Sequence, residues 1–177
     1  MKKFELTSEF NLNFFGRKFF RIKALVNIER YGVKAGDLGG WVEKEDNLSQ
    51  SGNAWVSGNA VVYGNAKVSG SAWVYGDAKV SGNAVVYGDA KVYGDAVVYG
   101  NADYAVIKGF GTVYRPTTFF RCHDGEARVT CGCFYGTIDE FREQVKRTRK
   151  GKVADEYLKI ADLMEYHFKK EDSGENV

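Results

Sequence analysis

The sequence predicts a mainly β protein: a parallel β-helix of three coils, preceded by a β-hairpin and followed by a small α+β module. Three observations predict this fold class. A six-residue motif recurs without insertion or deletion from Ser51 to Tyr104, every copy but the decaying last one carries an alanine and a valine separated by one residue, and both flanking regions lose this period. A short fixed period marks a solenoid, because one repeat cannot bury its own apolar face and must stack on its neighbours.

The N-terminal region, residues 1–50, is predicted to contain a β-hairpin and a capping segment. Apolar and polar residues alternate around Phe4 to Leu12 and again around Phe20 to Ala24, on either side of a bend at Phe15-Gly16-Arg17. Alternation with a period of two is typical of strands. Because the open end of a solenoid is a row of unpaired backbone groups, we expect this hairpin to cap or flank the first coil.

Residues 51–104 form the predicted β-helix. Alternate residues of a strand point to the same face, so the Ala and Val of each repeat, as in Ala54-Trp55-Val56, are expected to face the interior. The Gly-Asn or Gly-Asp pair of each repeat supplies the bend at a corner, since both residue types tolerate positive φ. With three sides per coil, the tract makes three coils that rise about 14 Å at the spacing of paired strands.

This pattern of a small residue two positions before an aliphatic one, at every sixth position, resembles the hexapeptide-repeat family of left-handed parallel β-helices. The resemblance covers about a third of the chain and implies the left-handed sense of the coil. The wording of the repeats, with GDLGGWV at Gly36 to Val42 and CGCFYGTIDEF at Cys131 to Phe141, also looks like uncharacterised proteins of bacteriophages and prophages. That likeness implies a viral origin and carries no known chemistry.

The enzymes of the hexapeptide-repeat family, acyltransferases and trimeric carbonic anhydrases, are implied by the resemblance to use histidines carried by the coils. This chain has no histidine between residues 51 and 104, because its two histidines are His123 and His167. No phosphate-binding glycine loop or dinucleotide fingerprint is present either. We therefore expect a protein that is not an enzyme and takes no cofactor, with a minimal acyltransferase as an alternative.

The residue between Ala and Val points outward, and the period of three repeats sorts these residues into three faces. One face carries two tryptophans one coil apart, which would leave a large apolar patch. A terminal segment of the same chain, a second copy of the chain, or a ligand or foreign protein would cover it. The candidate interface or binding residues are those of this face and two corner tyrosines: Trp55, Trp73, Lys91, Tyr75 and Tyr93.

Residues 105–170 are predicted to form a hairpin and two helices. Thr117 to Arg121 and Ala127 to Cys133 alternate as strands around an Asp-Gly turn. Four residues in this hairpin have the side chains that zinc prefers, but adjacent Cys-His and Cys-x-Cys spacings are not the common ones, and we expect buried thiols and no metal site. These residues are Cys122, His123, Cys131 and Cys133.

Two helices follow this hairpin. Thr137 and Glu140 form a capping box at the start of the first, which Gly151 is expected to end, and apolar spacing predicts the second from about Val153 to Phe168. The polar residues 171–177 are expected to be a disordered tail.

A local basic cluster lies at the end of the first predicted helix. Cations there complement the helix dipole, which would be a sufficient explanation, and a polyanion such as nucleic acid is the alternative that we do not favour. The cluster consists of Lys146, Arg147, Arg149, Lys150 and Lys152.

The total charge and the apolar runs of the chain limit its partners further. The net charge of +2 does not itself demand a polyanionic partner. The start of the chain lacks the apolar run of a signal peptide, and no run approaches the roughly 18 apolar residues of a membrane span. We expect a cytoplasmic protein without a membrane partner, located in the host cytoplasm if the chain is phage-encoded.

These inferences lead to a functional hypothesis. We expect a non-enzymatic, phage-type binding protein whose β-helix organises a homo-oligomer, a trimer or a dimer. It would engage a host protein or small ligand, and counteracting a host defence is the role that this hypothesis suggests. A self-assembling structural protein is the main rival. The resemblance to phage proteins supports only the host-directed part of this hypothesis, whereas the repeats support the scaffold.

Overall fold

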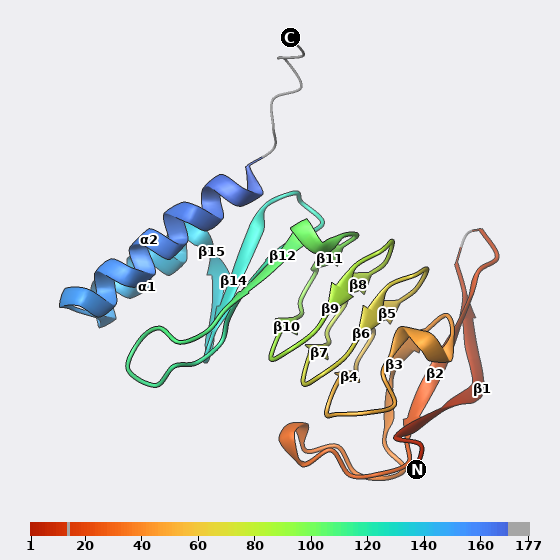
Figure 1. Ribbon diagram of the computed structural model, residues 1–177. Helices are drawn as coiled ribbons and strands as arrows, with labels where there is room; N and C mark the ends of the chain where they lie inside the picture. The colour runs from red at the N-terminus through yellow and green to blue at the C-terminus, as the bar shows by residue number, and fades with distance from the viewer. Residues whose placement is uncertain (14, 170–177) are drawn as a thin grey trace.

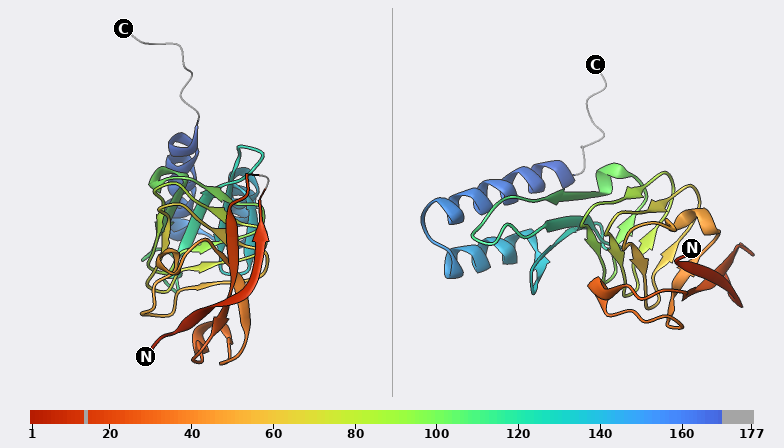
Figure 2. Two further views of the ribbon diagram at one scale, coloured as in Figure 1. Left: turned by 90° about the vertical axis from the view of Figure 1, so that its right-hand side faces the viewer. Right: turned by 60° about the horizontal axis from the view of Figure 1, so that its bottom comes forward.

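The computed structural model describes residues 1–13 and 15–169. The chain is arranged as a hairpin, a solenoid and an α+β module that follow one another along the molecule (Figures 1 and 2). This confirms the mainly β fold with a central β-solenoid of about three coils. The tail at residues 171–177, for which disorder was expected, lies outside the described residues. Within the described part of the chain, no helix is long and apolar enough to cross a membrane.

The solenoid consists of two-residue strands on three sides, and each pairs in parallel with a strand one coil away. Trp55 lies opposite Trp73, which lies opposite Lys91, so the register is the one that the period predicts. Backbone hydrogen bonds such as Trp55 N to Ala72 O, at 3.0 Å, join successive coils. The strands are β4 (Trp55–Val56), β5 (Val61–Val62), β6 (Lys67–Val68), β7 (Trp73–Val74), β8 (Lys79–Val80), β9 (Val85–Val86), β10 (Lys91–Val92) and β11 (Val97–Val98).

The interior of the solenoid is made of the alanines and valines of the repeats. Columns such as Val56, Val74 and Val92 are fully buried, and the alanines from Ala54 to Ala96 are equally inaccessible. The predicted inward positions are therefore confirmed from Ala54 to Val98, whereas in the last repeat Ala102 is exposed and lies in a 3-10 helix of residues 101–103. Burying apolar area contributes about 25 cal/mol per Å², so these regular columns are the main source of the stability of the coils.

The N-terminal end of the solenoid is capped by an antiparallel hairpin, as expected. Strands β1 (Phe4–Leu12) and β2 (Lys18–Ala24) pair with each other, and β2 pairs with β3 (Leu38–Val42). Strand β3 in turn pairs in parallel with β5, so one continuous sheet runs in the order β1-β2-β3-β5-β8-β11. Two short 3-10 helices, η1 (Glu29–Tyr31) and η2 (Glu45–Asn47), lie in the connecting segments.

Solenoid-type pairing begins earlier than the repeats suggest. Trp41 and Val42 lie opposite Val61 and Val62, and Leu48 forms a parallel bridge with Val68. The segment counted as a cap therefore supplies most of an additional coil. The partners are 20 residues apart rather than 18. The extra two residues between Leu48 and Val56 hide this coil from a search for a fixed period.

The C-terminal end of the solenoid is covered by a four-stranded antiparallel sheet. After η3 (Asn101–Asp103), the strands β12 (Tyr104–Ile107), β13 (Thr117–Arg121), β14 (Ala127–Cys131) and β15 (Phe134–Thr137) follow in order. Strand β13 lies between two cores: Phe120 packs into the core of the solenoid, while Phe119 packs into the core beneath the helices. Both rings are fully buried. The sheet thus joins the solenoid to the helical layer.

The helices α1 (Ile138–Thr148) and α2 (Gly151–Phe168) pack together on the outer side of this sheet (Figure 1). The predicted capping box is present, because Glu140 N donates to Thr137 Oγ1 at 3.1 Å and Thr137 N donates to Glu140 Oε2 at 2.7 Å. One boundary differs from the expectation. Gly151 begins α2 instead of ending α1, because α1 already ends at Thr148 and only Arg149 and Lys150 separate the helices.

Candidate binding surfaces

The tryptophan face of the solenoid is covered by the N-terminal segment of the same chain. Trp55 is only 1% exposed and lies against Gly39 of β3, where an added Cβ would be 2.7 Å from the indole. Trp73 is partly buried, its ring stacks on Tyr31 from η1 at 4.7 Å between centroids, and its Nε1 donates to Ser57 Oγ at 2.9 Å. In the described structure, a segment of the same chain therefore covers this face, rather than a second copy, a ligand or a foreign protein.

The corner tyrosines Tyr75 and Tyr93 belong to a ladder of stacked rings. The ladder runs from Tyr31 through Trp73 and Tyr75 to Tyr93, with centroid separations of 4.7, 4.3 and 4.6 Å. It continues to Tyr135 of β15, 4.6 Å from Tyr93. Burial and the neighbouring Tyr93 raise the pKa of Tyr75 to about 12. These tyrosines therefore join the N-terminal segment, the coils and the C-terminal sheet, so packing explains them without a ligand.

Lys91 has a different setting from the other residues of its face. It lines a groove of about 370 Å³ where η1, the last coil and the C-terminal sheet meet. Its backbone N donates to Thr118 Oγ1 at 3.2 Å, which fixes the coil against β13. The lining residues are Arg30, Asp89, Lys91, Arg115, Pro116, Thr118, Thr130, Gly132 and Cys133.

The charge of this groove is positive. Its only carboxylate, Asp89, is paired with Arg30 at 2.7 Å and with Lys108 at 2.7 Å. The hydrogen bond from Lys108 and the nearby Arg30 hold the pKa of Asp89 below its usual value, against the effect of burial. Among the described residues, Lys91 and Arg115 have no ion-pair partner. Two cationic side chains are thus left to meet an anionic group beside two threonine hydroxyls.

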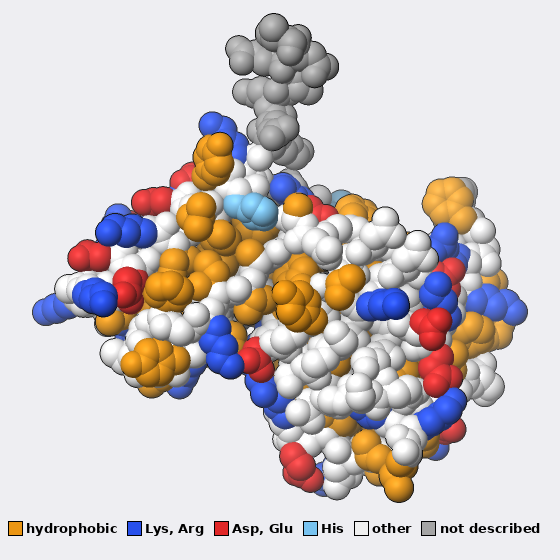
Figure 3. Space-filling model, viewed as in Figure 1, with side chains coloured by type: hydrophobic (Ala, Val, Ile, Leu, Met, Phe, Trp, Pro, Cys, Tyr) orange, Lys and Arg blue, Asp and Glu red, His pale blue; other side chains and the backbone are white. Residues whose placement is uncertain are grey.

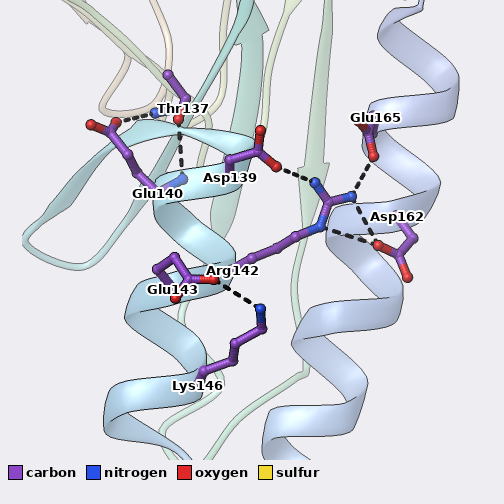
Figure 4. A network of polar contacts seen from close by, with 8 residues as sticks. All are labelled: Thr137, Asp139, Glu140, Arg142, Glu143, Lys146, Asp162 and Glu165. Atoms are coloured by element: carbon purple, nitrogen blue, oxygen red, sulfur yellow. Dashed lines mark hydrogen bonds and ion pairs between the residues drawn. The ribbon is translucent and has the colours of Figure 1, made fainter.

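A second hollow, of about 610 Å³, lies between the turn of the β13–β14 hairpin and the C-terminal half of α2. Three carboxylates of its lining are held by one cation, as Figure 4 shows: Arg142 of α1 bonds to Asp139 and reaches across to Asp162 and Glu165 of α2. The guanidinium side chain is 15% exposed. This network joins α1 to α2. Because its three carboxylates are already paired with Arg142, we propose no binding site in this hollow.

The cysteines and histidines of the module are not gathered into a metal site. Across the described residues, no group of three or more His, Cys, Asp or Glu is arranged to hold a metal ion. Cys122 is buried in the core of the solenoid end, while His123 beside it is exposed. Burial, reinforced by the carboxylate of Asp95, raises the pKa of the Cys122 thiol to about 12. A thiol of this kind stays protonated at neutral pH and is a poor ligand and nucleophile.

The five residues of the basic cluster are divided between the two helices. Lys146 and Arg147 lie in the last turn of α1, Arg149 is its C-cap, and Lys150 and Lys152 begin α2. All five are exposed. The helix dipole thus explains only the first three, because the N-terminus of α2 is itself the positive end of a helix. Figure 3 shows several Lys and Arg side chains at the end of the molecule that carries this turn, interspersed with Asp and Glu.

Comparison with known proteins supports the solenoid and gives no activity. Residues 62–76 match a family model described as YdcK Beta solenoid repeat. No curated protein matches the chain. The matched residues include β6 and β7 and the corner between them, so they lie entirely within the coils. In this stretch the chain is similar to a β-solenoid repeat, in agreement with the fold.

Proposed function

We propose that this chain is a non-enzymatic binding protein, in which the β-solenoid is a rigid scaffold and the groove beside Lys91 recognises an anionic group. The observation that carries the proposal is the pair of cations, Lys91 and Arg115, that line this groove without a carboxylate partner among the described residues. Unpaired cations in a partly enclosed groove favour a carboxylate or phosphate ligand, because charge-assisted hydrogen bonds are stronger there than in open water.

The origin of the groove supports a binding role. Arg30 comes from the N-terminal segment, Lys91 from the last coil and Arg115 from the segment before β13. Arg30 is paired with Asp89, and Lys91 lies in β10, which pairs with β7, so these two cations are positioned before a ligand arrives. Preorganisation lowers the entropy cost of binding. In the phage setting that the sequence resemblance implies, the anionic group would belong to a host protein or a host small molecule, and its capture would counteract a host defence.

The proposal is tested by ligand-induced stabilisation. We expect citrate, inorganic phosphate or a nucleoside phosphate to raise the melting temperature of the wild type, since a ligand at 100 times its Kd stabilises by about 2.7 kcal/mol. The variant Lys91→Ala should lose this shift. Lys79→Ala is the matched control, because Lys79 is an exposed outward residue of another side of the solenoid. An equal shift in both variants, or none in the wild type, would contradict a site at Lys91.

A homo-oligomer, trimeric or dimeric, is part of the same proposal. Because Trp55 is buried within the chain, the apolar area available to a second copy lies elsewhere, at Phe10 and Leu12 of β1, which are 45% and 60% exposed. Sedimentation velocity distinguishes the alternatives. A discrete trimer or dimer supports the proposal, while fibres that grow with concentration support the structural rival. Calorimetry with acetyl-CoA tests the acyltransferase alternative, for which we expect no heat of binding.

A further inference from the structure

We propose that the α1–α2 turn and the adjacent β12–β13 loop together form a surface that binds single-stranded nucleic acid. The first observation is the density of positive charge. Residues 144–154 include five cations and no carboxylate, whereas the rest of the chain has 20 Lys and Arg against 23 Asp and Glu. Such a local excess attracts a phosphate backbone even though the total charge is almost balanced.

Two of these cations lie where they oppose the helix dipole. Lys150 is the N-cap residue of α2 and Lys152 lies in its first turn, where the helix has no side-chain cap and no acidic residue. A cation at the N-terminus of a helix opposes the helix dipole and destabilises the helix. The structure therefore places positive charge where folding disfavours it. A role in binding explains this arrangement, whereas the helix dipole does not.

The cations of the turn remain available to a ligand. Lys146 pairs with Glu143 within α1 at 2.8 Å, and Lys152 pairs with Glu156 within α2 at 3.6 Å. Both lysines are exposed. Exposed pairs of this kind contribute little to stability. Exchange of such a partner for a phosphate is cheap, so these contacts do not block the surface.

The second observation is an exposed aromatic residue on the neighbouring loop. The loop of residues 108–116 is fastened to α2 by a hydrogen bond from Tyr157 Oη to Phe110 O at 3.3 Å. In Figures 1 and 2 it lies beside the end of the molecule that holds the α1–α2 turn. Tyr114 is 64% exposed, and its φ of 51° is a left-handed conformation that a tyrosine rarely adopts.

An exposed ring beside a basic surface favours a single strand over a duplex. Unpaired bases stack on aromatic side chains, while cationic side chains contact the phosphates. Arg115, the next residue, extends the positive charge from the turn towards the groove, because its guanidinium lies over Gly132. The loop and the turn thus combine the two features that sequence-independent single-strand binding requires.

The test is fluorescence anisotropy with a labelled single-stranded oligonucleotide of mixed sequence, titrated with the full chain at several salt concentrations. We expect salt-dependent binding that is about tenfold weaker in Lys150→Glu/Lys152→Glu, with the salt slope reduced by roughly 0.7 for each cation lost. Tyr114→Ala should weaken binding of the oligonucleotide but not of heparin, which has no bases to stack. Lys159→Glu, an exposed residue further along α2, is the matched control and should bind as the wild type does.

Folding of the variants is checked independently. Carboxylates at the start of α2 complement its dipole, so Lys150→Glu/Lys152→Glu should melt at a temperature no lower than the wild type. Wild-type binding that is absent, unaffected by this double substitution, or equally strong for the duplex of the same sequence or for anionic phosphatidylserine vesicles would overturn the proposal. Loss of oligonucleotide binding with citrate stabilisation at Lys91 intact would separate this surface from the groove.

Discussion

Lys3 shows how a single charged residue is accommodated inside the cap. Its side chain is almost fully buried, and Nζ donates to Ala54 O of the first coil at 2.6 Å. Burial disfavours the protonated amine and lowers its pKa from 10.5 to about 8. The hydrogen bond satisfies a carbonyl at the open end of the solenoid, so the residue serves the cap although its charge opposes folding.

The pH dependence of stability follows from this shift. The unfolded chain holds the Lys3 proton up to a higher pH than the folded chain, so the contribution of Lys3 to the free energy of unfolding rises with pH between about 8 and 10.5. Relative to Lys3→Met, the wild type should gain about 3 kcal/mol between pH 7 and 10.5. Urea denaturation at each pH measures this difference. Lys2→Met, at an exposed residue paired with Glu45, should show no such trend, and equal trends in both variants would refute the assignment to Lys3.

At the same scale, the sequence predicts which way a side chain points better than it predicts which residues bury it. The inward Ala and Val positions follow from the alternation of the strand alone, and those from Ala54 to Val98 are all buried. Trp55 is also outward in the register, but its burial depends on contact with Gly39, on a strand outside the regular repeats. Such contacts depend on how the flanking segment crosses the face, which a periodic pattern does not encode.

At the scale of the element, each corner of the solenoid depends on a glycine for two separate reasons. Gly52, Gly70 and Gly88 form one column, and their φ values of 71°, 68° and 69° all lie in the left-handed region. Their surroundings differ, however. A Cβ at Gly52 would lie 2.5 Å from Gly70 O of the next coil, whereas a Cβ at Gly88, on the outermost coil of this column, would meet nothing within 4 Å.

This difference separates conformational strain from close packing. Gly88→Ala should lower the free energy of unfolding by about 1–2 kcal/mol, which is the strain of a left-handed alanine. Gly52→Ala should lower it further, because the backbones of two coils must also move apart. Thermal unfolding of both variants, followed by circular dichroism, measures the difference. Equal losses would mean that the spacing between coils relaxes freely at this corner.

Other elements show where local sequence signals are sufficient. The hairpin of β13 and β14 and the capping box of α1 follow from an Asp-Gly turn and from Thr137 with Glu140, and the structure has both. Strand β3 was not identified because two extra residues break its register with the repeats. The groove beside Lys91 was not predicted either, since Arg30, Lys91 and Arg115 come from three separate segments whose meeting is a property of tertiary packing.

At the scale of the whole molecule, one hydrophobic core runs through parts that the sequence separates. It includes Phe4 and Ile22 of the hairpin, the columns of the coils, and Phe120 of the C-terminal sheet. The aromatic ladder from Tyr31 to Tyr135 follows the same course on the surface. Shared burial of this kind couples the stability of neighbouring units, so the cap, solenoid and module should unfold together.

This coupling is measurable because the solenoid and the C-terminal module carry different spectroscopic probes. All three tryptophans, Trp41, Trp55 and Trp73, lie in β3 or the coils, while the two α-helices of the described chain lie in the module. Tryptophan fluorescence and the far-ultraviolet signal of the helices should therefore give coincident melting curves for the wild type.

Phe120→Ala should separate the two curves. The ring is fully buried against the end of the solenoid, and its removal costs about 3–5 kcal/mol at the junction, so the helices should melt before the tryptophan signal changes. Val74→Ala is the control, because Val74 lies inside the coils and its removal leaves the junction intact, so that both curves should shift to lower temperature together. Curves that stay coincident in Phe120→Ala, or that are already separate in the wild type, would show that the solenoid and the module are coupled through contacts other than this ring.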